Sequence, residues 1–221
     1  MNISDLIIYN NNQLLALNKP AGIPVQSDKT GDKSLLDLAE IYCKHPVFLI
    51  HRIDRPVSGL VLFAKNKKAL GDMTRQMQAK KVHKEYLAIV TPKLKEDSGK
   101  LTSYLVKNEK VNKSFIVDKS QSNAKEAILN YQFVKSSDKY NLYKITIETG
   151  RHHQIRVQLQ EQNVHIKGDV KYGFRRANKD RSIDLHAWKL SFKHPITQKL
   201  VELVAPPIDN PIWNFMMGKE R

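Results

Sequence analysis

A single carboxylate, Asp54, lies among cations in a short polar stretch between two apolar runs. His51, Arg52 and Arg55 are its ionisable neighbours along the chain, and nearby cations favour the ionised form of a carboxylate. An ionised aspartate that is fixed in a loop can act as a nucleophile or as an acid–base group. A structural ion pair between Asp54 and an arginine is the simpler alternative, because such pairs are common.

Two short apolar runs must position this polar stretch. Residues 48–50 and 60–63 are apolar and partly β-branched, a composition typical of buried strands. Pro56 and Gly59 between them predict a tight loop. The sequence therefore places Asp54 in a loop at the end of a hydrophobic strand.

The composition points to a polyanionic partner. The chain has 221 residues, enough for one sizeable core, and carries a formal net charge of +15. A charge this large favours binding to polyanions, above all nucleic acid, with a merely soluble basic surface as the alternative. Cys43 is the only cysteine, which excludes an intramolecular disulfide, and we expect it to be a small buried hydrophobe.

The chain shows no targeting or membrane segment. Its start lacks a basic segment followed by a long apolar one, and no apolar run is long enough to cross a bilayer. We therefore expect a soluble, cytoplasmic protein with no membrane partner. We also expect a monomer without an obligate protein partner, because no surplus apolar helix face is apparent.

The pattern of apolar residues predicts an α+β fold. Strands outnumber helices, most connections suit antiparallel pairing, and no repeat or linker divides the chain. The fold class that we infer is a mixed, mostly antiparallel β-sheet core with a few flanking helices, in one domain over residues 1–221. The expected strands are 6–9, 14–17, 48–50, 60–63, 84–90, 101–106, 114–117, 127–134, 141–148, 185–192 and 200–204.

Three helices are expected between these strands. Ser34 and Asp37 form a capping pattern that predicts the start of the first helix. Residues 66–80 and 152–162 have the apolar spacing of the second and third. Prolines after residue 205 predict an irregular tail, which Trp213 and Phe215 would pack down.

Two motifs give the chain a family resemblance. The stretch HRIDRPVSGLVLFAK, residues 51–65, resembles the signature H-R-L-D-x-x-T-S-G-[LIV] of the RluA-type pseudouridine synthases. TGRHHQIRVQL, residues 149–159, is similar to the second signature of that family, T-G-R-[TS]-H-Q-[IL]-R-x-H-[LM]. The resemblance implies an RNA pseudouridine synthase fold with a central active-site cleft. Because the sequence starts directly with the first expected strand hairpin, we expect no separate N-terminal RNA-binding domain.

The resemblance also implies an isomerase that converts specific uridines in tRNA or rRNA to pseudouridine. The reaction breaks the C1′–N1 bond, turns the base over and reattaches it through C5. Because no atoms are gained or lost, no cofactor is required. The target nucleotide must first be flipped out, since its reactive atoms are inaccessible in a duplex.

The resemblance assigns roles to four residues. Asp54 matches the catalytic carboxylate, which could attack C1′ or remove a proton from C2′. Tyr86 matches the active-site tyrosine that stacks on the target base, although an isolated strand tyrosine is more often a core residue. Arg156 matches the arginine that pairs with the catalytic aspartate, and a guanidinium suits this role because it stays charged. Arg52 matches the arginine that helps to flip the target nucleotide.

Further basic residues are candidates for RNA contact. The loop over residues 167–181 interleaves cations with aromatic rings, a composition that suits RNA backbone contact and base stacking. Arg151 is interpreted as a phosphate contact or a structural residue. The candidates are His51, Arg52, Arg55, Arg151, Lys171, Arg175 and Arg176.

Two departures from the family pattern matter for the candidate site. Val57 replaces the usual Thr, and His152 replaces the usual Thr or Ser. The lost hydroxyl could loosen the catalytic loop, and His152 could alter a helix cap. Asp54, Tyr86 and Arg156 are all retained, so we expect an active enzyme.

Two other functions are alternatives. A non-catalytic, basic RNA-binding or ribosome-assembly factor on the same fold would retain the charge without the chemistry. A phosphodiester nuclease would need clustered carboxylates for divalent metals, whereas the acidic residues here are scattered. His51, His152 and His153 lack the spacing of a metal site, so we predict no metal.

Overall fold

The computed structural model describes residues 2–218 and divides the chain into two units. The first unit contains the chain up to Lys84 together with His186–Ile208. The second contains Glu85–Leu185 and the segment that begins at Asp209. The expectation of a single domain over residues 1–221 stays a prediction.

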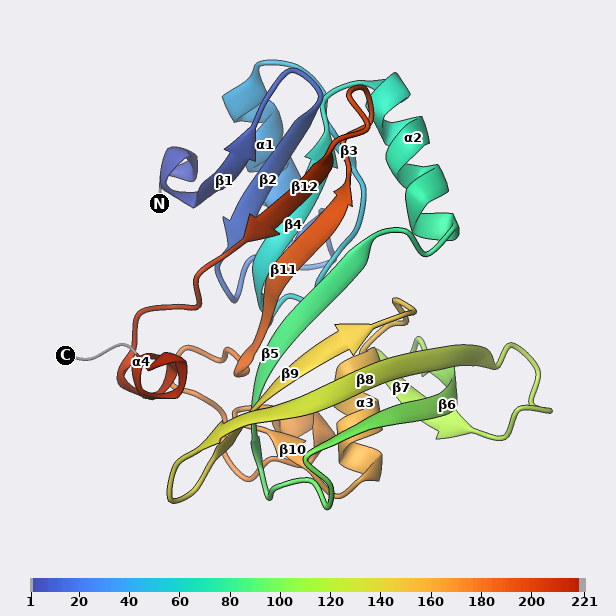
Figure 1. The fold of residues 1–221 in the computed structure, drawn as a ribbon, viewed down its shortest axis with the longest axis vertical. Helices are drawn as coiled ribbons and strands as arrows, with labels where there is room; N and C mark the ends of the chain where they lie inside the picture. The colour runs from blue at the N-terminus through green and yellow to red at the C-terminus, as the bar shows by residue number, and fades with distance from the viewer. Residues whose placement is uncertain (1, 219–221) are drawn as a thin grey trace. The chain divides into compact units, whose positions relative to one another are not determined.

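The first unit is built around strand β4 (Ser58–Ala64), which lies between β2 (Leu14–Lys19) and β11 (Leu185–Lys193) (Figure 1). β2 runs antiparallel to β4 and β11 runs parallel to it, so the pairing is mixed. The outer strands are all antiparallel to their neighbours: β1 (Ile7–Asn10) pairs with β2, β3 (Phe48–Leu49) with β4, and β12 (Leu200–Val204) with β11.

The helices of this unit begin at capping residues that the sequence shows. In α1 (Leu35–Cys43) the Asp37 N–H donates to Ser34 Oγ at 3.2 Å, and Asp37 Oδ2 accepts from the Ser34 N–H at 2.8 Å. This confirms the predicted capping box. In α2 (Lys67–Gln78) the Asn66 side chain accepts from the Ala69 N–H. A short 3-10 helix, η1 (Ile3–Leu6), precedes β1.

The core of the first unit brings together segments that are distant in sequence. Leu14 on β2, Leu62 on β4, Met73 on α2 and Phe192 on β11 belong to one buried cluster. Full burial of such side chains stabilises a fold by about 1.5–3 kcal/mol each. The two strands that flank the Asp54 loop, β3 and β4, therefore both pack against this apolar core.

The second unit follows the strand order β5-β9-β8-β6-β7 (Figure 1). β8 pairs antiparallel with β9 and with β6, as the alternating pattern predicted for the first of these pairs. β10 pairs with β5 outside this order. The bounds are β5 (His83–Thr91), β6 (Ser98–Asn108), β7 (Lys113–Val117), β8 (Lys125–Ser136), β9 (Asn141–Ile147) and β10 (His165–Ile166).

Helix α3 (Gln154–Glu161) begins later than the sequence predicted. His153 has a left-handed backbone with φ of 54°, which ends the preceding turn and moves the helix start from residue 152 to Gln154. The second signature therefore straddles a sharp turn and the first turns of a helix. A short 3-10 helix, η2 (Val170–Tyr172), follows β10.

The prediction of an irregular C-terminal tail was wrong, because Pro211–Met217 form helix α4. The Asn210 side chain caps it by accepting from the Trp213 N–H at 2.9 Å, and proline is compatible with a first helical position. Trp213 is buried and its Nε1 donates to Asp184 Oδ1, as expected of a residue that packs the tail down. Phe215 is 49% exposed, which contradicts the same expectation.

The predicted fold class is confirmed: within residues 2–218, four α-helices accompany a mixed, mostly antiparallel set of strands. The central cleft that the resemblance implies stays a prediction. No helix within residues 2–218 has the length and apolar character needed to cross a membrane.

Candidate active site

The loop that carries Asp54 connects β3 to β4 in the first unit, as the sequence predicted. The Val57 N–H donates to the Asp54 carbonyl at 3.0 Å and closes a turn around the candidate residue. Gly59, with φ of 113°, lies so close to β11 that a Cβ atom would come within 2.2 Å of the Ala187 carbonyl oxygen. The signature therefore needs glycine here for both conformation and space.

Lys19 lies behind this loop as a fully buried cation. Its Nζ donates to the carbonyl oxygens of Pro20, Ile23 and Arg55 at 2.9, 2.9 and 3.1 Å. Three acceptors match the three N–H donors of an ammonium group. Burial lowers the pKa of Lys19 to about 7, while the nearby charge of Asp54 acts in the opposite direction. Lys19 thus joins the end of β2 to the residue that follows Asp54.

Replacing Lys19 by methionine is expected to destabilise the first unit. Three partly buried carbonyl groups would each lose the hydrogen bond from Nζ, at a cost of about 2–3 kcal/mol in the free energy of unfolding. Urea unfolding checks this, with Lys68→Met on the exposed side of α2 as the control, which should change stability by less than about 0.5 kcal/mol. Equal midpoints for the two variants would show that the three carbonyl contacts carry no net stability.

The other candidates in this loop differ in their surroundings. Arg55 donates from Nε to the Gly22 carbonyl at 2.8 Å, and its guanidinium pairs with Asp28 and Asp32. The pKa of His51 is lowered to about 3 by burial and by the charge of Lys84, so its ring is neutral near pH 7. Arg52 is exposed. The roles of all three in RNA binding stay predictions.

The second unit holds Arg156 in a buried ion pair. Arg156 Nε donates to Asp169 Oδ2 at 2.7 Å and Nη2 donates to Oδ1 at 2.8 Å. Arg156 and Asp169 are 5% and 1% exposed. This paired geometry leaves Nη1 outside the contact with Asp169 and fixes the plane of the guanidinium. The predicted pairing of Arg156 with Asp54 stays a prediction.

Tyr172 packs against the same guanidinium. Its ring centroid lies 4.9 Å from Arg156 Cζ, an arrangement in which a cation is attracted to an aromatic face. Its hydroxyl accepts from the Ser114 N–H at 2.9 Å and lies 2.8 Å from His153 Nδ1. Apolar periodicity and residue spacing along the chain give no signal for these contacts.

Val57 and His152, the two residues that replace the usual Thr or Ser of the family pattern, each have defined neighbours in the structure. Val57 is buried, with 2% of its surface exposed. His152 stacks on the His153 ring at a centroid distance of 3.7 Å, and its Nδ1 lies 2.9 Å from Ser114 Oγ. His152 therefore connects the start of the second signature to β7, which a threonine or serine side chain has less reach to do.

The remaining candidates lie in the second unit. Tyr86 is on β5 and only 8% exposed. Arg151 is exposed and donates from Nε to the Glu126 carbonyl at 2.8 Å. Lys171, Arg175 and Arg176 are exposed on and after η2. Their roles stay predictions.

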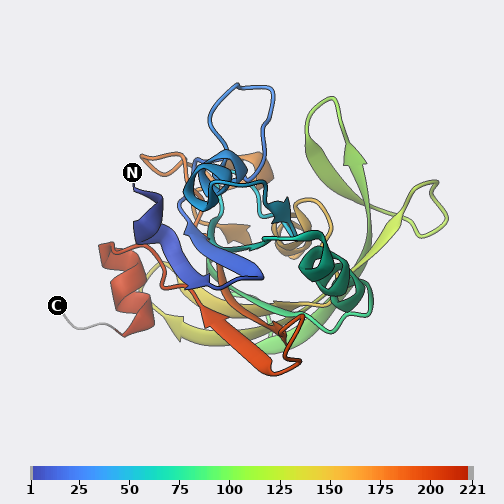
Figure 2. The ribbon, with the colours of Figure 1, turned by 90° about the horizontal axis from the view of Figure 1, so that it is seen from above.

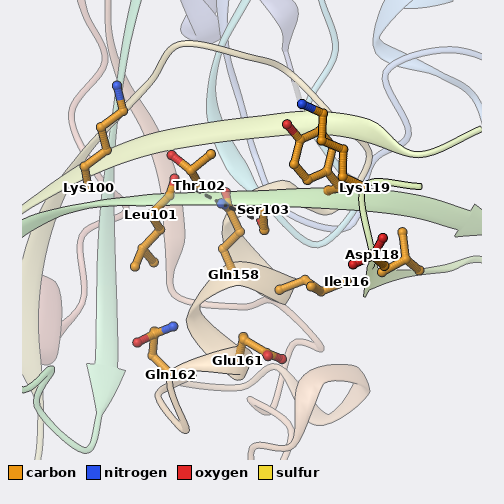
Figure 3. A pocket seen from close by; sticks show the side chains of 12 residues that line it. Lys100, Leu101, Thr102, Ser103, Ile116, Asp118, Lys119, Gln158, Glu161 and Gln162 are labelled. Carbon is orange, nitrogen blue, oxygen red and sulfur yellow. Dashed lines mark hydrogen bonds between the residues drawn. The ribbon is translucent and has the colours of Figure 1, made fainter. Parts of the chain in front are cut away.

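A pocket of about 490 Å³ opens between β6, β7 and the C-terminal half of α3, and none of the candidates lines it (Figure 3). Gln158 lies at its centre, where the family signature has histidine. Its Nε2 donates to Leu101, Ser103 and Ala127, whereas Oε1 is buried and accepts no hydrogen bond from residues 2–218. We interpret Gln158 as structural, because its amide joins α3 to two strands.

Buried neutral histidines predict loss of stability in acid. Burial lowers the pKa of His186 to about 4 and that of His153 to about 2. The unfolded chain binds more protons than the folded chain below pH 6.5, so the free energy of unfolding should fall from pH 6.5 to 4, by about 1.4 kcal/mol per pH unit for each group. Urea unfolding across this range checks the slope. His186→Gln should flatten it, and a matching effect of His83→Gln on the exposed start of β5 would contradict the account.

Metal ligation finds no support among residues 2–218, where no group of three or more His, Cys, Asp or Glu side chains is gathered to hold an ion.

The sequence of this chain is similar to those of known proteins. The family described as RNA pseudouridylate synthase matches residues 13–161. An uncharacterized RNA pseudouridine synthase of Mycoplasma pneumoniae is 36% identical over 200 residues, which cover 87% of this chain and 63% of the relative. The ribosomal large subunit pseudouridine synthase C of Buchnera aphidicola is 32% identical, over 92% of this chain and 67% of the relative. This chain thus spans about two thirds of the length of these two relatives.

A third relative matches this chain over most of its own length. The tRNA pseudouridine synthase C of Haemophilus ducreyi is 32% identical, over 90% of this chain and 89% of the relative. Among solved structures, human RNA pseudouridylate synthase domain containing 4 superposes with a TM-score of 0.77 at 24% identity, over 98% of this chain and 93% of that one. At this identity the structural likeness shows a shared fold.

Proposed function

Because the chain belongs to the RNA pseudouridylate synthase family, of the RluA type, we propose that it is an RNA pseudouridine synthase that isomerises specific uridines in tRNA or rRNA. The observation that carries the proposal is Asp54, which retains the catalytic position of the signature in a loop held by β3 and β4. Relatives named for ribosomal RNA and for tRNA support both RNA classes.

The proposed chemistry needs one carboxylate, one cation and one flat surface. Asp54 supplies the carboxylate, which attacks C1′ or removes a proton from C2′ so that the C1′–N1 bond breaks. Arg156 holds that carboxylate ionised and oriented, and Tyr86 stacks on the free base while it turns. C1′ then bonds to C5 while either the bond from Asp54 to C1′ breaks or the proton returns to C2′. The hydrogen on C5 leaves as a proton and N1 gains one. The atoms balance without a cofactor.

Two observed contacts support these roles. Lys19 is buried next to the Asp54 loop, and its Nζ donates to the carbonyl of the residue that follows Asp54. Asp169 fixes the Arg156 guanidinium with both of its oxygens, so that its remaining nitrogen has a defined direction. Both contacts reduce the reorganisation that the reaction would otherwise require.

RNA is the proposed partner of the exposed cations. Arg52 would help to flip the target nucleotide, while Arg151, Lys171, Arg175 and Arg176 would contact phosphates. The formal net charge of +15 supports a polyanionic substrate. We further propose that the protein acts as a cytoplasmic monomer.

Release of tritium from RNA labelled at C5 of uridine, in the absence of a methyl donor, tests the proposal, because pseudouridine formation detaches that hydrogen without cutting the chain. Purified protein should release tritium from at least one tRNA or rRNA transcript, and a chelator should not reduce the rate. Binding of every transcript without release would contradict the proposal and favour a non-catalytic RNA-binding or ribosome-assembly factor. Chain cleavage that stops in chelator would indicate a nuclease.

A further inference from the structure

The β6–β7 hairpin ends in an exposed turn that carries lysines and apolar side chains. β6 and β7 stay paired up to Asn108 and Lys113, and Figure 2 shows the green hairpin extending from its unit. The Asn108 side chain accepts from the Lys110 N–H at 3.0 Å, so the turn has a defined shape. Val111 is 55% and Phe115 43% exposed. An exposed aromatic ring among cations is typical of a binding surface.

Contacts from the loop after β10 brace this turn. Lys171 Nζ donates to the Asn112 carbonyl at 3.2 Å, and the Ser114 N–H donates to the Tyr172 hydroxyl at 2.9 Å. Lys113 Nζ lies 4.7 Å from the Tyr172 ring centroid and 5.6 Å from that of Phe115. The hairpin turn and η2 therefore form one continuous surface. Because these contacts already hold the turn in place, a ligand that binds there would cost it little conformational entropy.

The charge of this surface fits a polyanion. Glu109, which pairs with Lys107 at 2.6 Å, is the one carboxylate in the turn, and Asp169 is buried against Arg156. We define the basic arm as this surface, with the members Lys107, Lys110, Lys113, Phe115 and Lys171.

We propose that the basic arm binds an unpaired stretch of the substrate RNA outside the target nucleotide, with phosphates on its lysines and one base stacked on Phe115. Stacking on an exposed ring requires a base that is not paired, which favours a loop or a single strand over a duplex. β7 is the last strand in the order of its unit and could also pair with a strand of another protein. The excess of cations favours RNA over that partner.

This inference rests on the proposed function for the identity of the RNA, but its test does not require turnover. Equilibrium binding is measured with a short single-stranded RNA and with the same RNA in a duplex, over a range of salt concentrations. The variants are Phe115→Ala, Phe115→Trp and Lys110→Ala. The matched controls are Val134→Ala, an exposed apolar residue on β8, and Lys139→Ala in the β8–β9 turn.

Phe115→Ala should weaken binding of the single strand about five-fold or more, and Phe115→Trp should retain it. Lys110→Ala should reduce the slope of log affinity against log salt by about 0.7, the value for one phosphate contact on a single strand. The controls should change neither quantity. A larger loss on the duplex than on the single strand would contradict the stacking role of Phe115.

Failure of this inference is distinguishable from failure of the proposed function. If the protein forms pseudouridine but the arm variants bind RNA as well as the controls do, the basic arm is not an RNA site. If the arm variants lose affinity but no RNA gains pseudouridine, the basic arm is an RNA-binding site and the proposed synthase activity is refuted. Unchanged RNA affinity with loss of a bound protein would assign the surface to a protein partner and overturn the inference.

Discussion

Asp54→Asn is expected to leave RNA binding unchanged and to reduce pseudouridine formation by a factor of about 10³ or more. The amide has the shape of the carboxylate but can neither attack C1′ nor accept a proton from C2′ at neutral pH. The turn around residue 54 should persist, because it is closed by the backbone contact from Val57. Single-turnover tritium release with saturating protein measures the chemical step separately from RNA binding.

Asp5→Asn provides the control for this variant. Asp5 is an exposed carboxylate on η1, and its replacement should leave both binding and turnover within experimental error. If Asp54→Asn retained the turnover of the unmodified protein, the catalytic role of this carboxylate would be refuted and a non-catalytic RNA-binding role would gain support. Loss of RNA binding in parallel with turnover would instead identify Asp54 as a structural residue of the loop.

The second large effect is expected at the buried ion pair. Asp169→Ala leaves the Arg156 guanidinium buried without its carboxylate, and breaking such a pair costs about 3–5 kcal/mol in the free energy of unfolding. Turnover should fall as well, because Asp169 no longer holds the Arg156 guanidinium in a fixed orientation. Urea unfolding and single-turnover rates, measured at a temperature where the variant stays folded, check the two effects.

A double variant separates stability from catalysis at this pair. Arg156→Met with Asp169→Leu replaces two buried charges by apolar side chains of similar size, which is often neutral or stabilising. We expect this protein to unfold at a urea concentration close to that of the unmodified protein and to form no pseudouridine. An active double variant would show that Arg156 and Asp169 serve only the fold.

Local signals predicted much of the first unit. The capping pattern of Ser34 and Asp37, the alternation of the strands and the loop between residues 50 and 58 all depend on near neighbours in sequence, and each is found in the structure. The hairpin of β8 and β9 was predicted for the same reason. Family resemblance, rather than periodicity, gave the chemical roles of Asp54, Tyr86 and Arg156.

The features that sequence reasoning missed depend on tertiary contacts. The carboxylate of Asp169 meets Arg156 because η2 packs against α3, and no spacing along the chain encodes that contact. The guanidinium of Arg55, a candidate for RNA contact, also pairs with Asp28 and Asp32 in an earlier loop, and no spacing along the chain predicts these ion pairs. Helix α4 was missed because Pro211 was treated as a breaker, although proline at the first helical position is favourable.

The most direct measurement of the proposed function is a transcriptome-wide map of pseudouridine in the parent cells. Three strains are compared: one without the gene, one with the unmodified gene restored and one with the Asp54→Asn copy restored. The account predicts at least one tRNA or rRNA site that disappears with the gene and returns only with the unmodified copy. Identical maps in all three strains would contradict the assignment of this protein as a pseudouridine synthase.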